Sequence, residues 1–118
     1  METFEIITHL LVGPLMVVLS LIFIYFPPKT INALYGHRTT FSMINQDTWD
    51  EANKRSPAMI FIVSAATCII QLTGIIFGVA FDTILIYACI FLIAGLVVGA
   101  IVVERQIRTI FDKEGNRK

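Results

Sequence analysis

Three long segments without a charged residue constrain the fold of this 118-residue chain more than any other feature. Residues 6–26, 58–80 and 84–103 form runs of 21, 23 and 20 uncharged residues. A helix needs roughly 20 residues to cross the hydrocarbon core of a bilayer, which is about 30 Å thick. A soluble domain would hardly bury three such segments. The sequence therefore predicts an all-α integral membrane protein with three transmembrane helices, forming one membrane domain over residues 1–118.

The first uncharged segment has few features of a cleavable signal peptide. No basic residue precedes it, and only Glu2 and Glu5 carry charge there. The pair Pro27–Pro28 follows the segment and is typical of a helix end. We therefore expect the first segment to remain in the protein as a membrane span.

The basic residues indicate how the spans are oriented. All nine Lys and Arg residues lie in the connection 27–57 or in the tail 104–118. The N-terminal segment and the short turn at residues 81–83 carry only acidic residues. Because cytoplasmic loops are enriched in Lys and Arg, we expect the N-terminus outside and the C-terminus inside, with the connection and the tail cytoplasmic.

The charges and cysteines disfavour several classes of function. Acidic residues accompany the basic ones and the net charge is zero, so we expect no nucleic-acid partner. The spans hold no ionised side chain of the kind that proton-coupled transporters use. Cys68 and Cys89 lie in different spans, about 10 Å apart in height if the turn is at 81–83, which is too far for a disulfide. No Cys or His spacing indicates a metal, and we expect no cofactor.

Small residues recur at helical intervals in the second and third segments: Gly74, Gly78, Gly95 and Gly99. Such GxxxG pairs allow helix backbones to approach closely in lipid. With a turn at 81–83, Gly99 would face Ala65 and Gly95 would face Cys68. We expect packing within the chain, while contact in a homodimer stays open as an alternative.

Gln71 lies near the middle of the second segment and His9 near the outer end of the first. Lipid offers no hydrogen-bond partner, so an amide at this depth needs one from the protein. We expect Gln71 to form an interhelical hydrogen bond. Lining of a cavity by Gln71 is the alternative, and His9 is expected at the membrane interface.

Residues 47–56 have the pattern of a short amphipathic helix. Thr48 and Glu51 have the spacing of a capping box. Two acid-to-base pairs at i, i+4 lie on one face: Asp50–Lys54 and Glu51–Arg55. The sequence predicts that this helix ends where Ser56 caps the second span and Pro57 begins it.

The other face of that helix presents Trp49, Ala52 and Asn53. We expect Trp49 at the headgroup level and Asn53 bonded to neighbouring backbone. Before the helix, Gly36 permits an unusual backbone angle in a turn, and Arg38 is placed to bind a lipid phosphate or a carboxylate such as Asp50. These side chains either form an internal clip under the bundle or contact a ligand directly.

The stretch PPKTINALYGHRTTFSMINQDTWDEANKRS resembles the signature of the SdpI/YfhL family of small bacterial membrane proteins. The matching positions are Tyr35, Gly36, Arg38, Thr39, Ser42, Met43, Trp49, Ala52 and Asn53. His37, Thr40 and Ile44 depart from the residues usual in that signature. The resemblance implies a multi-pass protein of the bacterial cytoplasmic membrane.

The named member of the family is an immunity protein against a secreted peptide toxin, and it holds a transcriptional repressor at the membrane. The resemblance therefore implies resistance or signalling through non-enzymatic binding of a hydrophobic peptide or a lipid, with a cytoplasmic regulator as partner. Two alternatives remain. One is an accessory subunit or scaffold that docks a larger membrane protein. The other is an interfacial enzyme acting on lipid headgroups through His37, Arg38, Asp47, Asp50 and Glu51.

Overall fold

The structure is a computed structural model that describes residues 2–118. Within these residues the chain forms four helices: α1 (Thr3–Leu10), α2 (Gly13–Tyr25), α3 (Gln46–Ile76) and α4 (Phe81–Ile110). Three units are long and apolar enough to cross a membrane, namely α1 with α2, α3, and α4. The prediction of an all-helical chain with three apolar spans is confirmed.

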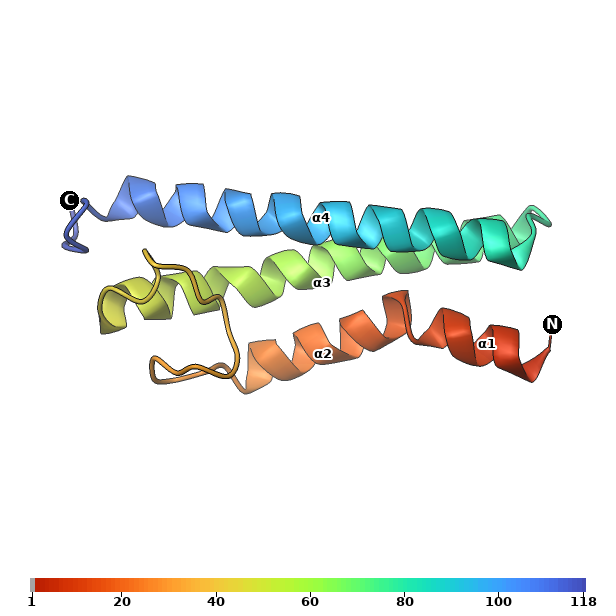
Figure 1. Cartoon of the computed structure of the whole chain (residues 1–118), viewed down its shortest axis with the longest axis horizontal. Helices are drawn as coiled ribbons and strands as arrows, with labels where there is room; N and C mark the ends of the chain where they lie inside the picture. The colour runs from red at the N-terminus through yellow and green to blue at the C-terminus, as the bar shows by residue number, and fades with distance from the viewer. Residues whose placement is uncertain (1) are drawn as a thin grey trace.

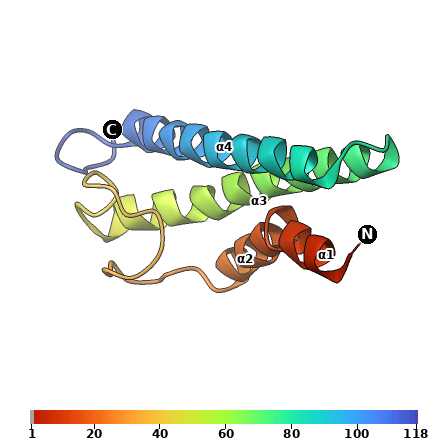
Figure 2. The ribbon, with the colours of Figure 1, turned by 45° about the vertical axis from the view of Figure 1, so that its right-hand side comes forward.

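The helices form an elongated bundle 52 Å long (Figure 1). α3 and α4 run antiparallel and side by side along their whole length. α1 and α2 run along α3, and Val12 at their junction also packs against Ala88 and Leu92 of α4. Residues 26–45 join α2 to α3, and from here on we call them the connection. The connection and the C-terminus lie together at one end of the bundle, as Figure 2 also shows. We call this region, residues 26–57 and 104–118, the loop end.

The helices are longer than a bilayer requires. α3 has 31 residues, so it is about 46 Å long at 1.5 Å per residue, against a hydrocarbon core of about 30 Å. Its first turns and the last turns of α4 extend past the uncharged segments into the loop end. This extension gives the connection a helical wall to fold against.

The prediction that residues 47–56 form a separate amphipathic helix is wrong, because α3 continues through Pro57 without a break. Proline removes only one hydrogen bond of the ladder, the one to the Asn53 carbonyl. The helix begins earlier than expected, at a capping box in which Asn45 Oδ1 accepts from the Thr48 N–H (2.9 Å) and Thr48 Oγ1 accepts from the Asn45 N–H (3.1 Å). The expected box of Thr48 with Glu51 is one turn too late.

The first span consists of two helices rather than one. α1 ends at Leu10, and α2 begins at Gly13 with Pro14 in its first turn. Proline has no N–H to donate to the Leu10 carbonyl, and Gly13 beside it lowers the helix propensity further, so a break is favoured at this point. The chain therefore bends at Leu11 and Val12, in the middle of an apolar segment.

Three of the four glycines pack within the chain, as predicted. A Cβ added to Gly95 would lie 2.5 Å from Val63 Cγ1, and one added to Gly99 would lie 2.6 Å from Met59 Cγ. Their partners are not the expected Ala65 and Cys68, because the turn occupies residues 77–80 instead of 81–83. Each glycine contacts α3 about one and a half turns nearer to its start.

Of the remaining two glycines, Gly74 packs within the chain and Gly78 does not. Gly74 packs against Ile84, with only 2.8 Å between an added Cβ and Ile84 Cγ1. Gly78 lies in the turn with a φ of +74° and has no heavy atom within 4 Å of an added Cβ, so it is not a packing residue. The shifted register also brings Cys89 nearly level with Cys68. The expected difference in height is therefore wrong, although both thiols are free.

Gln71 and His9 join the three spans inside the bundle. Gln71 Nε2 donates to the His9 carbonyl (3.0 Å) and to His9 Nδ1 (3.2 Å), which confirms the predicted interhelical bond. His9 is buried within the bundle, and its Nε2–H donates to the Phe81 carbonyl (3.1 Å), while its expected position at the depth of the membrane interface stays a prediction. Gln71 Oε1 faces Gly13, where no Cβ would fit, and has no hydrogen-bond partner within residues 2–118.

Candidate functional site

The connection folds against α3 at Gly36. Its φ of +114° confirms the unusual backbone angle expected there. A Cβ at this position would lie 2.6 Å from Asn53 Oδ1 and 2.9 Å from Pro28 Cγ. Glycine is therefore required both by the backbone conformation and by the close approach to α3.

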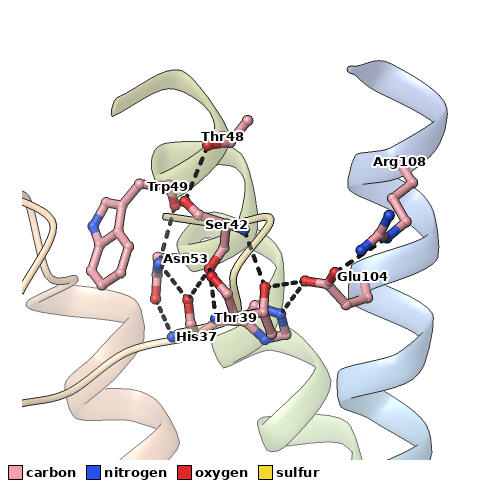
Figure 3. Close-up of polar contacts among 8 residues, drawn as sticks. All are labelled: His37, Thr39, Ser42, Thr48, Trp49, Asn53, Glu104 and Arg108. Carbon is pink, nitrogen blue, oxygen red and sulfur yellow. Dashed lines mark hydrogen bonds and ion pairs between the residues drawn. The ribbon is translucent and has the colours of Figure 1, made fainter. Parts of the chain in front are cut away.

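Asn53 holds the next residue of the connection in place (Figure 3). Its Oδ1 accepts a hydrogen bond from the His37 N–H at 2.6 Å, and its Nδ2 donates to the carbonyls of Trp49 (3.1 Å) and His37 (3.4 Å). The side chain is buried, so these bonds replace contacts with water. The prediction that Asn53 bonds neighbouring backbone is confirmed.

Thr39 and Ser42 close a compact turn beside Asn53. The Thr39 N–H donates to Ser42 Oγ (2.9 Å), and the Ser42 hydroxyl donates to the carbonyls of His37 (2.8 Å) and Thr39 (3.0 Å). The buried hydroxyl of Thr48 donates to the Ser42 carbonyl (3.1 Å). In this irregular turn, side chains therefore supply the hydrogen bonds that backbone groups would have in a regular helix or sheet.

Glu104 ties this turn to α4. It accepts hydrogen bonds at Oε1 from His37 Nε2 (3.1 Å) and from the Thr39 hydroxyl, while Arg108 Nε donates to Oε2 (3.3 Å) (Figure 3). Glu104 is the first residue beyond the uncharged segment 84–103. Burial works to raise the pKa of its carboxyl, but the bonds from Thr39 and His37 and the charges nearby outweigh it, and the pKa lies below its usual value. We call Gly36, His37, Thr39, Ser42, Asn53 and Glu104 the loop clip.

Trp49 connects the same region to the end of the first span. The indole is fully buried, and its Nε1–H donates to the Pro28 carbonyl at 2.7 Å. Ala52, on the same helix face, is also buried and packs with Phe41, Val103 and Ile107. Trp49 is therefore enclosed by protein, and its expected position at the headgroup level stays a prediction.

Arg38 lies outside the loop clip. Its side chain is exposed, and its Nε donates to the Asn32 carbonyl (3.2 Å) instead of pairing with Asp50 or Glu51. Tyr35 is also exposed. Among the described residues, these two signature side chains are left at the surface, where a partner can reach them.

The tail folds back onto the start of α3. Arg117 pairs with both oxygens of Asp47 (2.7 and 2.9 Å) and with Glu51 Oε1 (3.0 Å), and Glu51 also pairs with Arg55 (3.3 Å) as predicted. The hydrogen bond from Arg117 is the main cause that lowers the pKa of Glu51. The pKa of Arg117 is raised by its bonds to Asp47 and Glu51.

The groups proposed for an interfacial enzyme do not converge. His37 is engaged with Glu104, whereas Asp47 and Glu51 are engaged with Arg117. Asp50 accepts from Gln46 Nε2 (2.7 Å), so the predicted pair with Lys54 is not formed. Within residues 2–118 no group of three His, Cys, Asp or Glu side chains is placed to hold a metal ion.

The sequence did not predict that His37 and Glu104 meet. The two residues are 67 positions apart, and His37 is itself a departure from the signature. One signal could have indicated this contact. Glu104 is the first charged residue after the third span, and the predicted topology places it on the same side of the membrane as the connection.

Comparison with known proteins gives two matches. A model of the SdpI/YfhL protein family matches residues 29–104. The protein YfhL of Bacillus subtilis (strain 168), described as uncharacterized, is 32% identical over 108 residues, which cover 92% of this chain and 93% of the relative. No solved structure matches the chain. The family match starts inside the connection, at Lys29, and ends at Glu104, so it contains both sides of the loop clip.

Proposed function

Because the chain belongs to the SdpI/YfhL protein family, we propose that it is a non-enzymatic membrane protein of the bacterial cytoplasmic membrane that gives resistance to a membrane-active peptide or toxin, or signals its presence. The ligand in this proposal is a hydrophobic peptide or a lipid bound at the spans. The cytoplasmic connection then transmits the bound state to a regulator.

The loop clip is the observation that supports this proposal. The connection is bonded to α3 through Asn53 and to α4 through Glu104, and Trp49 bonds the end of the first span. A change in the relative position of the three spans would alter these bonds. The connection therefore has the contacts that a reporter of the membrane-embedded part needs.

The surface of the connection supports a cytoplasmic partner. Arg38 and Tyr35 are exposed beside the loop clip, so a change in the clip would move them directly. Arg38 carries a guanidinium suited to a carboxylate on the partner. We propose that a regulator binds here and that the protein works as a monomer or a homodimer.

The accessory-subunit alternative loses much of its basis. Gly74, Gly95 and Gly99 are occupied by side chains of the same chain. A larger membrane partner would have to dock on the outward apolar faces of the helices, which every membrane span has.

A complementation experiment tests the proposal. A deletion strain is supplied with the wild-type protein, with Arg38→Ala, or with Arg105→Ala as the matched control, because both arginines are exposed at the same end. Survival is measured against a panel of membrane-active peptides, with protein levels checked by immunoblotting. We expect the deletion and Arg38→Ala strains to be sensitive and the Arg105→Ala strain to resemble wild type. Equal survival of the deletion strain and the wild type across the panel refutes a resistance role.

A further inference from the structure

A cavity of about 400 Å³ lies at the loop end, and neither Arg38 nor Glu104 lines it. One wall comes from the residues that follow the first span, Pro27, Pro28 and Lys29. The other wall comes from the first turns of α3, through Gln46, Asp50, Lys54 and the loop-clip residue Asn53. The cavity is thus formed where the end of one span meets the beginning of the next.

The two lysines of this cavity are free to bind an anion. Neither Lys29 nor Lys54 forms a salt bridge with a carboxylate of residues 2–118. Asp50 lies four residues before Lys54, but its Oδ1 is engaged by Gln46 Nε2 at 2.7 Å. The same Gln46 nitrogen donates to the Lys29 carbonyl at 2.6 Å, which holds the two walls together.

Asp50 adds the opposite charge to the same cavity. One of its oxygens is fixed by Gln46, and no hydrogen bond from residues 2–118 reaches the other. The cavity therefore combines two ammonium groups with one carboxylate, which suits a ligand that carries both a phosphate and an amine.

The position of the cavity indicates where such a ligand comes from. The first span ends at Tyr25, and the side chains of Tyr25 and Phe26 are 75% and 73% exposed. Exposed aromatic residues at the end of a span are typical of the interface between lipid tails and headgroups. Lys29 follows three residues after Phe26, so we expect the cavity to open near the depth of the lipid phosphates.

We propose that this cavity binds the headgroup of an aminophospholipid of the phosphatidylethanolamine type. Lys29 and Lys54 contact the phosphate, and Asp50 receives the protonated amine. The acyl chains lie along α2 beside Tyr25 and Phe26. A bound lipid in this position bridges the first span to α3 and is separate from the regulator surface around Arg38.

Native mass spectrometry of the detergent-purified protein tests the proposal. The probes are short-chain phosphatidylethanolamine, phosphatidylglycerol, diacylglycerol and inorganic phosphate. The variants are Lys29→Gln/Lys54→Gln, Asp50→Asn, and Lys113→Gln as a control that removes one exposed positive charge from the tail. All substituted side chains are exposed, and circular dichroism checks that each variant keeps its helices.

We expect the double lysine variant to bind both phospholipids roughly 25-fold more weakly, since each lysine beside the lipid phosphate contributes about fivefold in affinity. Asp50→Asn should lose the preference for phosphatidylethanolamine over phosphatidylglycerol, and Lys113→Gln should match wild type. Unchanged phospholipid binding by the double variant, or equal binding of diacylglycerol by the wild type, refutes a headgroup site. If inorganic phosphate saturates the site at the same concentration as the phospholipids, the ligand is a free anion and the lipid proposal is refuted. An unchanged preference for phosphatidylethanolamine in Asp50→Asn would refute the amine contact.

Discussion

Replacing Asn53 with alanine should release the connection from α3 while leaving the helices in place. The substitution removes the acceptor of the 2.6 Å bond from the buried His37 N–H. It also removes two Nδ2 bonds, but the His37 carbonyl keeps its bond from the Ser42 hydroxyl. The main cost is thus one buried N–H without a partner, which is about 2 kcal/mol.

Hydrogen exchange of the Thr39 amide measures this cost. Its N–H donates to Ser42 Oγ at 2.9 Å and does not touch Asn53, so it reports the opening of the whole turn. A loss of about 2 kcal/mol corresponds to roughly 30-fold faster exchange when closing is rapid. The measurement is made by NMR in detergent micelles.

Asn32→Ala is the matched control. Asn32 Oδ1 caps the backbone N–H groups of Leu34 and Tyr35 in the exposed part of the connection, outside the loop clip. This variant should leave Thr39 exchange within about twofold of wild type, since surface changes rarely exceed about 0.5 kcal/mol. If Asn53→Ala raises Thr39 exchange less than threefold, Asn53 does not hold the connection and our description of the loop clip is wrong.

Four further predictions concern other contacts. Gly36→Ala should destabilise the protein to unfolding in sodium dodecyl sulfate by about 2–4 kcal/mol, from backbone strain and the clash with Asn53, whereas Gly78→Ala, strained without a clash, should cost about 1 kcal/mol. Gly95→Ala should cost about 1–3 kcal/mol through overpacking against Val63, and adding Val63→Ala should recover part of this loss in the same assay. Gln71→Leu should cost only about 1 kcal/mol, since interhelical hydrogen bonds in membranes are weak and Oε1 is already unpaired; a loss above about 3 kcal/mol would contradict this. Because the folded-state pKa of Glu51 is lowered, the stabilising contact with Arg117 Nη2 should be complete above about pH 5 and lost as the pH falls through the folded-state pKa, which the carboxyl carbon resonance of Glu51 can follow and Glu51→Gln should abolish.

The three spans were predictable because each is a strong local signal. An uncharged run of 20 residues identifies a span without any knowledge of its neighbours. The buried face of α3 was equally local, since Trp49, Ala52 and Asn53 share a helix face by spacing alone and are buried together. Gly36 was also predictable, because a glycine in a turn signals an unusual backbone angle.

The errors arose where a local signal competes with packing. Pro57 is a common first residue of a helix, but here α3 is held on both sides of it by contacts of Trp49, Asn53 and Met59. The turn was placed three residues late because Asp82 was taken as a loop residue, whereas it lies in the first turn of α4. That shift moved every expected contact between α3 and α4.

The contact of His37 with Glu104 at the centre of the candidate site could not be predicted from the sequence, for a different reason. Arg38 was expected to bind a lipid phosphate or a nearby carboxylate because its guanidinium can fork onto either group. The positive φ of Gly36 and the bond from the His37 N–H to Asn53 instead direct His37 inward and leave Arg38 outside. Which of two adjacent side chains points inward depends on backbone angles that composition does not reveal.

The bend at Leu11 and Val12 gives the bundle unequal mechanical freedom. A slide of α4 along α3 by one residue, about 1.5 Å, would break the bonds of His37 and Thr39 to Glu104. The helix pair α3 and α4 therefore resists piston motion. The first span has a joint instead, and α1 is held through the hydrogen bonds of His9 to Gln71 and Phe81. A force applied to α1 would therefore be resisted by the hydrogen bonds of His9, and once these break α1 would turn about the bend while α3 and α4 keep their relative position.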